Sequence, residues 1–188
     1  EDCDLLIAIG ARFDDRVAGV PKLFAPHAKI VHFDIDAAEI GKVKQVDWHH
    51  VGDAKVVLRD LLLHGKGIAL KHENWLKHVK AMKKAHPFDY DHEKDIIQPQ
   101  MVLDLLNKMT KGEAIICTGV GQHQMFAAQY MDFHKPRTWL TSGSMGTMGF
   151  GLPAAIGAQF ACPGKLVIDV DGDGSLRMNI GAMETATT

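Results

Sequence analysis

The sequence predicts an α/β fold in which parts of two parallel-sheet domains follow one another along the chain. Three observations lead to this prediction. Short continuous apolar runs that end in Gly or Asp are typical of strands buried on both faces of a parallel sheet. Segments with apolar residues at helical spacing alternate with these runs, as they do in βαβ units. Residues 66–96 are rich in Lys, His and Asp, which indicates a connector between the two parts.

The pattern of apolar runs and capping residues over 1–65 predicts the C-terminal part of a first domain. Asp36 and Asp53 each precede a segment with helical spacing, where a short carboxylate side chain is a favourable N-cap. Gly65 follows His64 and is suited to closing the second of these helices. The predicted elements are strands at residues 5–9 and 29–33, a short helix at 36–40 and a longer helix at 53–64.

The remaining chain predicts a linker and the N-terminal part of a second domain. In the linker, residues 66–96, an amphipathic helix over 75–85 precedes an exposed connector over 86–91. The second domain, residues 97–188, begins with a predicted helix. Pro99 is suited to opening this helix, because proline is tolerated in the first turn. The expected order is helix 101–109, strand 114–117, helix 121–130, strand 138–140, helix 152–161 and strand 166–170.

Composition excludes several classes of protein. The chain has 188 residues, is 46% hydrophobic and carries 21 basic against 23 acidic residues, so it lacks the basic field of a nucleic-acid-binding protein. Its three cysteines form no C-x-x-C pair, which favours a reducing, cytoplasmic setting. No run is apolar and long enough to span a membrane. Because the chain begins without Met and stops within a predicted helix, we expect an internal fragment of a longer protein.

The run Gly172-Asp173-Gly174-Ser175 directly follows the apolar strand at residues 166–170. A carboxylate there can hold Mg²⁺, which in proteins is often shared between one or two carboxylates and a phosphate. A following helix would favour the same anion. Taken alone, the run is more typical of a Gly/Asp turn at the end of a strand than of a metal site. No Lys follows as it would in an ATP-binding P-loop.

Two further loops follow predicted parallel strands, at residues 118–123 and 142–149. Ligands of such sheets bind beyond the carboxyl ends of the strands, so we expect the three loops to converge on one edge. Met145 and Met148 lie in the second loop. A methionine there could support a flat heteroaromatic ring, although its default interpretation is core packing.

Histidines are frequent in the middle of the chain, but none forms an H-x-x-x-H pair with a carboxylate beside it. We therefore expect solvated surface side chains rather than metal ligands. The residues concerned are His49, His50, His64, His72, His78 and His86.

Five ordered motifs resemble the thiamine-diphosphate enzymes, and specifically the acetolactate synthase (acetohydroxyacid synthase) catalytic subunits. They are residues 9–17 (IGARFDDRV), 32–40 (HFDIDAAEI), 119–125 (GVGQHQM) and 145–158 (MGTMGFGLPAAIGA), followed by Gly172-Asp173-Gly174-Ser175. The similarity runs in order over nearly the whole chain and is weakest in the connector. It implies an FAD-binding middle domain followed by a thiamine-diphosphate-binding domain.

The resemblance implies roles for the second domain. Met148 would wedge thiamine diphosphate into a bent shape, and Asp173 would bind Mg²⁺. Gln122 and His123 would lie near the diphosphate. No catalytic set is complete in the fragment, because the family's second metal ligand, an Asn, and its activating Glu lie outside this chain. The implied thiamine-diphosphate residues are Val120, Gly121, Gln122, His123, Gly146, Met148, Asp173, Gly174 and Ser175.

The resemblance also implies FAD contacts in the first domain. From the residues alone, Asp34 at a strand end suits a ribose hydroxyl, whereas Arg12 and Arg16 are equally consistent with surface ion pairs to Asp14 and Asp15. The implied FAD residues are Gly10, Arg12, Asp14, Arg16, Val17, Asp34, Ile35 and Glu39.

The implied activity is decarboxylation of pyruvate and its condensation with pyruvate or 2-oxobutyrate, the first common step of branched-chain amino acid biosynthesis. The implied assembly is a homodimer or homotetramer with a small regulatory subunit, with no nucleic acid or membrane as partner. Two departures from the family's usual pattern are Gly143-Ser144 and Leu176-Arg177. Pyruvate oxidase, glyoxylate carboligase and a non-catalytic cofactor-binding module stay open as alternatives, and the isolated fragment is expected to be inactive.

Overall fold

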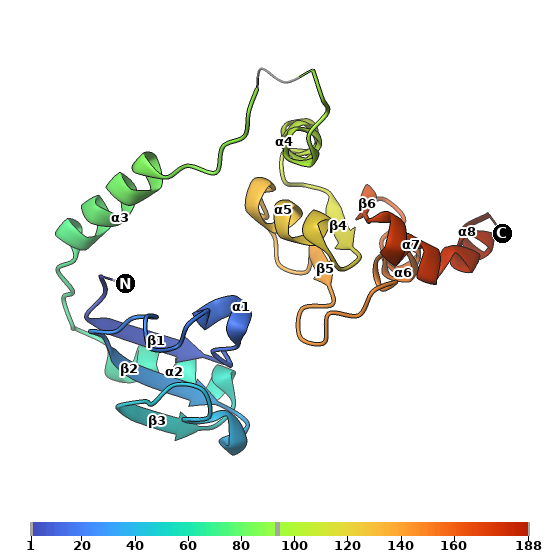
Figure 1. Ribbon diagram of the computed structural model, residues 1–188. Coiled ribbons are helices and arrows are strands. Elements are labelled where there is room, and N and C mark those ends of the chain that lie inside the picture. The colour runs from blue at the N-terminus through green and yellow to red at the C-terminus, as the bar shows by residue number, and fades with distance from the viewer. Residues whose placement is uncertain (1, 93–94, 188) are drawn as a thin grey trace. The chain divides into compact units, whose positions relative to one another are not determined.

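A computed structural model describes residues 2–92 and 95–187, which divide into two compact units between Glu73 and Asn74 (Figure 1). Each unit contains a three-stranded sheet in which every strand pair is parallel. The predicted α/β class is confirmed. The division falls at the start of α3 (Glu73–Ala85), a helix with no buried residue. The finer domain limits at residues 65 and 97 stay a prediction.

The sheet of the first unit has the order β1-β2-β3, formed by β1 (Leu5–Ile9), β2 (Lys29–Asp34) and β3 (Trp48–Val51). Ile9 pairs with Phe33, and Asp34 pairs with Val51, so the carboxyl ends of all three strands share one edge. Helix α2 (Ala54–His64) follows β3 and packs on the sheet (Figure 1). A small core lies around Ala8, Phe13, Ala18 and Ile30.

Two elements of this unit were not predicted. Strand β3 has the sequence Trp-His-His-Val with all four residues exposed, so it lacks the apolar run that marks a buried strand. It forms because its backbone completes the ladder to β2. Helix α1 (Asp15–Ala18) is a single turn that depends on Asp14, whose carboxylate accepts the N–H groups of Arg16 and Val17.

The second unit has the sheet order β5-β4-β6, with β4 (Ile115–Thr118) in the centre. The other strands are β5 (Trp139–Thr141) and β6 (Val167–Val170). The predicted helices are present, and three short helical segments close the chain. The helices are α4 (Pro99–Thr110), α5 (Gln122–Tyr130), α6 (Gly151–Ala161), α7 (Asp173–Met178), the 3-10 turn η2 (Ile180–Ala182) and α8 (Met183–Thr187).

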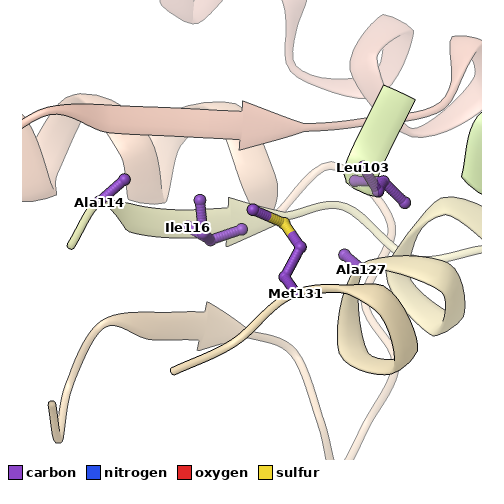
Figure 2. Close-up of a cluster of buried hydrophobic side chains, with 5 residues drawn as sticks. All are labelled: Leu103, Ala114, Ile116, Ala127 and Met131. Atoms are coloured by element: carbon purple, nitrogen blue, oxygen red, sulfur yellow. The ribbon is translucent and has the colours of Figure 1, made fainter. Parts of the chain in front are cut away.

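The core of this unit joins the central strand to α4 and α5. Ile116 on β4 lies opposite Met131, which follows α5, and Leu103 of α4 and Ala127 of α5 lie beside them (Figure 2). Ala127 is fully buried, and Ile116 and Leu103 are almost so. This packing fixes β4 against both helices and so holds the loop after β4 in place.

The predicted helix starts are largely confirmed. Asp53 accepts the N–H groups of Lys55 and Val56 at the start of α2, and Pro99 occupies the first turn of α4. Asp36 caps only a 3-10 turn, η1 (Ala37–Glu39), rather than an α-helix. Within the described part of the chain, every helix is too short or too polar to cross a bilayer.

Candidate functional site

The three loops of the second unit converge on one edge, as predicted. Thr118 pairs with both Thr141 and Val170, so β4, β5 and β6 end at the same level. Ser175, which is 1% exposed, joins the loops: its hydroxyl oxygen accepts the N–H of Val120 at 3.4 Å and that of Gly149 at 2.9 Å. One side chain therefore ties together the segments that follow all three strands.

The loop between β5 and α6 lies against the other two loops. A Cβ on Gly146, which has φ +63°, would lie 3.8 Å from the Val120 side chain. The Met148 methyl group would lie 3.2 Å from a Cβ on Gly174. Met145 is 87% and Met148 39% exposed, so the interpretation of these methionines as core packing is wrong. Met148 instead lies over the Gly172–Ser175 turn at the edge of a cavity of about 480 Å³.

Three carboxylates alternate along the end of β6, and the structure gives them different environments. Asp173, the predicted metal ligand, is the first residue of α7 and is exposed. The Asp171 side chain is only 6% exposed, and Asp169 has a buried oxygen, Oδ1, without a hydrogen-bond partner. Burial, together with the Asp171 carboxylate, raises the pKa of Asp169 from 3.8 to about 6. Asp169 and Asp171 were missed, although Asp169 lies within the strand predicted to be buried at residues 166–170 and Asp171 directly follows it.

The residues at the start of α5 divide into exposed and packed groups. Gln122 is exposed, and Gln124 donates to the Thr141 hydroxyl at 2.7 Å, which connects α5 to β5. The His123 side chain is 17% exposed, and its Nε2 atom lies 3.5 Å from Oδ1 of Asp171. Gly121 precedes the helix and would place a Cβ 2.9 Å from the His123 ring. This edge therefore combines an imidazole, one exposed carboxylate and closely packed glycines.

The first unit carries a cavity of about 410 Å³ at the carboxyl ends of its strands. Asp34, a buried residue at the end of β2, lines it and accepts the N–H of Asp36 at 2.9 Å. Five of the eight predicted FAD residues come together around this space: Gly10, Arg12, Asp34, Ile35 and Glu39. Gly52, Asp53 and Ala54 also line it and were missed as site residues, because β3 was not predicted.

The other three predicted FAD residues lie on or beside α1 and do not line this cavity. Asp14 uses its carboxylate to cap α1 and to bind Arg12, whose Nη2 lies 3.1 Å away. Val17 is 52% exposed, and Arg16 lies 4.0 Å from Asp15. The surface ion pairs considered for Arg12 and Arg16 are therefore present.

The histidine-rich middle of the chain behaves as predicted, since all six histidines are exposed. His78, for example, stacks on Trp75. Among the described residues, no cluster of three or more His, Cys, Asp or Glu side chains has the arrangement of a metal site. In proteins, Mg²⁺ is usually shared between one or two carboxylates and a phosphate.

Comparison with known proteins gives a family match within each of the two units. The family model for the C-terminal thiamine pyrophosphate (diphosphate) binding domain of thiamine pyrophosphate enzymes matches residues 119–188, and that for their central domain matches residues 1–61. The chain belongs to the thiamine pyrophosphate enzyme family. It is 51% identical over 187 residues to the acetolactate synthase large subunit of Corynebacterium glutamicum. Chloroplastic acetolactate synthases of Nicotiana tabacum and Arabidopsis thaliana are 50% and 48% identical over 189 residues.

These alignments cover 97–98% of this chain but only 28–30% of each relative, so the chain spans less than a third of the curated relatives it matches. The two matched segments lie in different structural units, and each unit contains one candidate site. The residues present fit the family's cofactor in three respects. Met148 lines a cavity of about 480 Å³, a Cβ on Gly146 would meet nothing closer than 3.8 Å, and Asp173 is exposed at the same edge.

Proposed function

We propose that this chain is the cofactor-binding part of an acetolactate synthase catalytic subunit. The carrying observation is the identity of about 50% to acetolactate synthases along nearly the whole chain. In this proposal, two molecules of pyruvate, or pyruvate and 2-oxobutyrate, are joined with loss of CO₂ in the first common step of branched-chain amino acid biosynthesis. Thiamine diphosphate supplies the electron sink for decarboxylation when bound, and the protein supplies binding and orientation.

In the second unit, Asp173 would bind Mg²⁺ and Met148 would support the bent cofactor. The remaining proposed thiamine-diphosphate residues, from Val120 to Ser175, keep the roles given by the resemblance. In the first unit, Gly10, Arg12, Asp34, Ile35 and Glu39 would hold FAD in the 410 Å³ cavity. Asp14, Arg16 and Val17 would contact FAD only from beside that cavity. FAD would be structural in this proposal.

The test is an assay of acetolactate from pyruvate with the whole protein that contains this segment, supplied with thiamine diphosphate, Mg²⁺ and FAD. We expect acetolactate without consumption of O₂. The variant D173N should lose Mg²⁺-dependent cofactor binding by about 100-fold, because a carboxylate ligand is replaced by a neutral amide. The matched control is D60N, which changes an exposed Asp on α2 in the other unit.

Other outcomes of this assay point to the alternatives. Oxygen consumption with pyruvate would indicate a pyruvate oxidase, and turnover of glyoxylate would indicate a carboligase. A whole protein without Mg²⁺-dependent binding of thiamine diphosphate would be a non-catalytic module. We further propose a cytoplasmic homodimer or homotetramer with a small regulatory subunit, which light scattering with and without that subunit would check.

A further inference from the structure

Asp171 and His123 form a contact to which the proposed function assigns no role. Asp171 directly follows β6, and His123 lies in the first turn of α5. Their side chains are 6% and 17% exposed, and Nε2 lies 3.5 Å from Oδ1, just beyond the usual hydrogen-bond range of about 2.7–3.2 Å. Nε2 and the second carboxylate oxygen, Oδ2, are both buried without a hydrogen-bond partner. Burying such atoms unpaired costs about 1–3 kcal/mol each, so this arrangement is not explained by stability.

The backbone holds the two side chains in this arrangement. Gly119 leaves room for the carboxylate, since a Cβ there would lie 1.8 Å from Oδ1 of Asp171. The N–H of Gly172 donates to the same oxygen at 2.9 Å and fixes its direction. The position of the Asp171 carboxylate is therefore fixed by both the loop after β4 and the turn after β6.

The imidazole is held from its other edge. The Nδ1 and Cε1 atoms of His123 lie 2.8–3.1 Å from the positions that Cβ atoms on Gly121 and Gly172 would occupy. These glycines precede α5 and α7, so this ring edge covers the point where the two helices begin. Any side chain at either glycine would displace the ring.

We propose that Asp171 is a positioning residue that orients His123 toward the diphosphate of the bound cofactor. By facing Nε2, the carboxylate sets the ring so that its Nδ1 edge is directed to the Gly121 and Gly172 turns. Asp173, which would bind the Mg²⁺ that holds the diphosphate, directly follows Gly172, so a diphosphate bound there would lie near the His123 ring. This inference rests on the proposed function, because it presupposes that thiamine diphosphate binds at this edge. Partners that orient a ligand-binding histidine typically contribute 10- to 100-fold to affinity.

The experiment is a double-mutant cycle on the apo form of the whole protein, with thiamine diphosphate affinity measured by calorimetry in Mg²⁺. The variants are D171N, H123Q and D171N/H123Q. We expect D171N to weaken binding about 10- to 100-fold and to have no further effect when His123 is already Gln. Inorganic diphosphate should lose affinity by the same factor, and thiamine without phosphate should not.

Two controls separate positioning from folding. D169N changes the neighbouring buried carboxylate of β6 and should leave thiamine diphosphate affinity within about twofold of wild type. FAD affinity, which reports on the other unit, should be unchanged in every variant. If D171N fails to retain FAD, D171S, which keeps an acceptor for the Gly172 N–H, goes through the same cycle.

The outcomes are distinguishable. Wild-type protein that does not bind thiamine diphosphate refutes the proposed function itself. Wild-type binding with fully additive losses in the cycle, or with an unchanged affinity in D171N, refutes only the role of Asp171. A loss confined to compounds that carry the diphosphate, and absent in the His123→Gln background, supports it.

Discussion

Each of the two units contains a contact between a histidine and an aspartate near the carboxyl ends of its strands. The more buried partner is the histidine in the first unit and the aspartate in the second. In the first unit His32 is completely buried, 3.8 Å from Asp34, and the carboxylate lines the 410 Å³ cavity. In the second unit the carboxylate of Asp171 is the buried partner, and His123 is the more exposed one. The more accessible member of each contact, Asp34 in the first and His123 in the second, decides the chemistry offered to a ligand. A carboxylate accepts hydroxyl groups such as those of a ribose, whereas an imidazole among glycine amides suits a phosphate.

The two units also differ in the glycine that follows the first strand of each sheet, which is Gly10 in the first unit and Gly119 in the second. Gly10 has φ +64°, and nothing lies within 4 Å of the position its Cβ would take. It is required by backbone conformation alone. Gly119 is buried, and a Cβ there would overlap Asp171 and Ser175. It is required because the Asp171 and Ser175 side chains, both from the segment after β6, pack directly on its Cα atom.

The largest expected effect is that of G119A, for which G10A is the matched control. The added methyl group at residue 119 must displace buried atoms in a packed edge, so thiamine diphosphate affinity should fall about 100-fold or more. G10A should cost only about 1 kcal/mol in backbone strain, and G10N less, because Asn tolerates the left-handed region. Calorimetry of both cofactors would check the pair. Equal effects of the two alanines would remove the distinction between these glycines.

Removing the Ser175 hydroxyl tests how the second edge is held together. S175A deprives the N–H groups of Val120 and Gly149 of their acceptor in a buried position, which should destabilise this unit by about 1–3 kcal/mol. S142A removes a hydroxyl that accepts only the N–H of exposed Thr147 and should cost less than about 1 kcal/mol. Thermal unfolding of both variants would compare them, and similar losses would contradict a special role for Ser175.

The buried carboxylate Asp169 makes stability depend on pH in the second unit. Its pKa is raised from 3.8 to about 6, so the folded state binds the extra proton in this window, and stability falls as the pH rises through it. D169N cannot ionise and should exceed wild type by about 1–2 kcal/mol at pH 7 but not at pH 4. Unfolding midpoints at the two pH values measure this difference. A constant offset between variant and wild type would show that ionisation is not the cause.

The smallest expected effect comes from the buried histidine of the first unit. H32L replaces two ring nitrogens without hydrogen-bond partners by an apolar side chain of similar size, so stability should rise by about 1 kcal/mol. Asp34 would lose its neighbour, and FAD affinity should fall about tenfold. H49L, at an exposed residue of β3, should change neither quantity. Unchanged FAD affinity in H32L would leave His32 with a packing role against Phe13 alone.

Local patterns in the sequence were sufficient for most of the fold. The apolar runs of β1, β2, β4 and β6 and the helical spacing of α2 and α4 indicated the α/β class, because burial imposes these periods on any chain. Strand β3 escaped prediction, since an exposed edge strand needs only backbone pairing and leaves no apolar period.

The candidate sites, like the fold, were predicted from the sequence only in part. The motif at residues 172–175 was recognisable, and the convergence of three loops followed from the rule for parallel sheets. The contact of Asp171 with His123, the exposure of Met148 and the place of Gly52 and Asp53 beside the first cavity were not predictable. Each depends on which residues from distant parts of the chain pack against them.

The sequence by itself determined the class of fold, the order of its elements and the family, because periodicity, capping residues and motifs are local properties. Tertiary structure alone decided which of the three carboxylates after residue 168 is exposed, and that Asp171 is buried against His123. Strand register and the approach of Gly119 to Asp171 set these outcomes. Both arise from contacts between residues more than 50 positions apart, and no local pattern encodes such contacts.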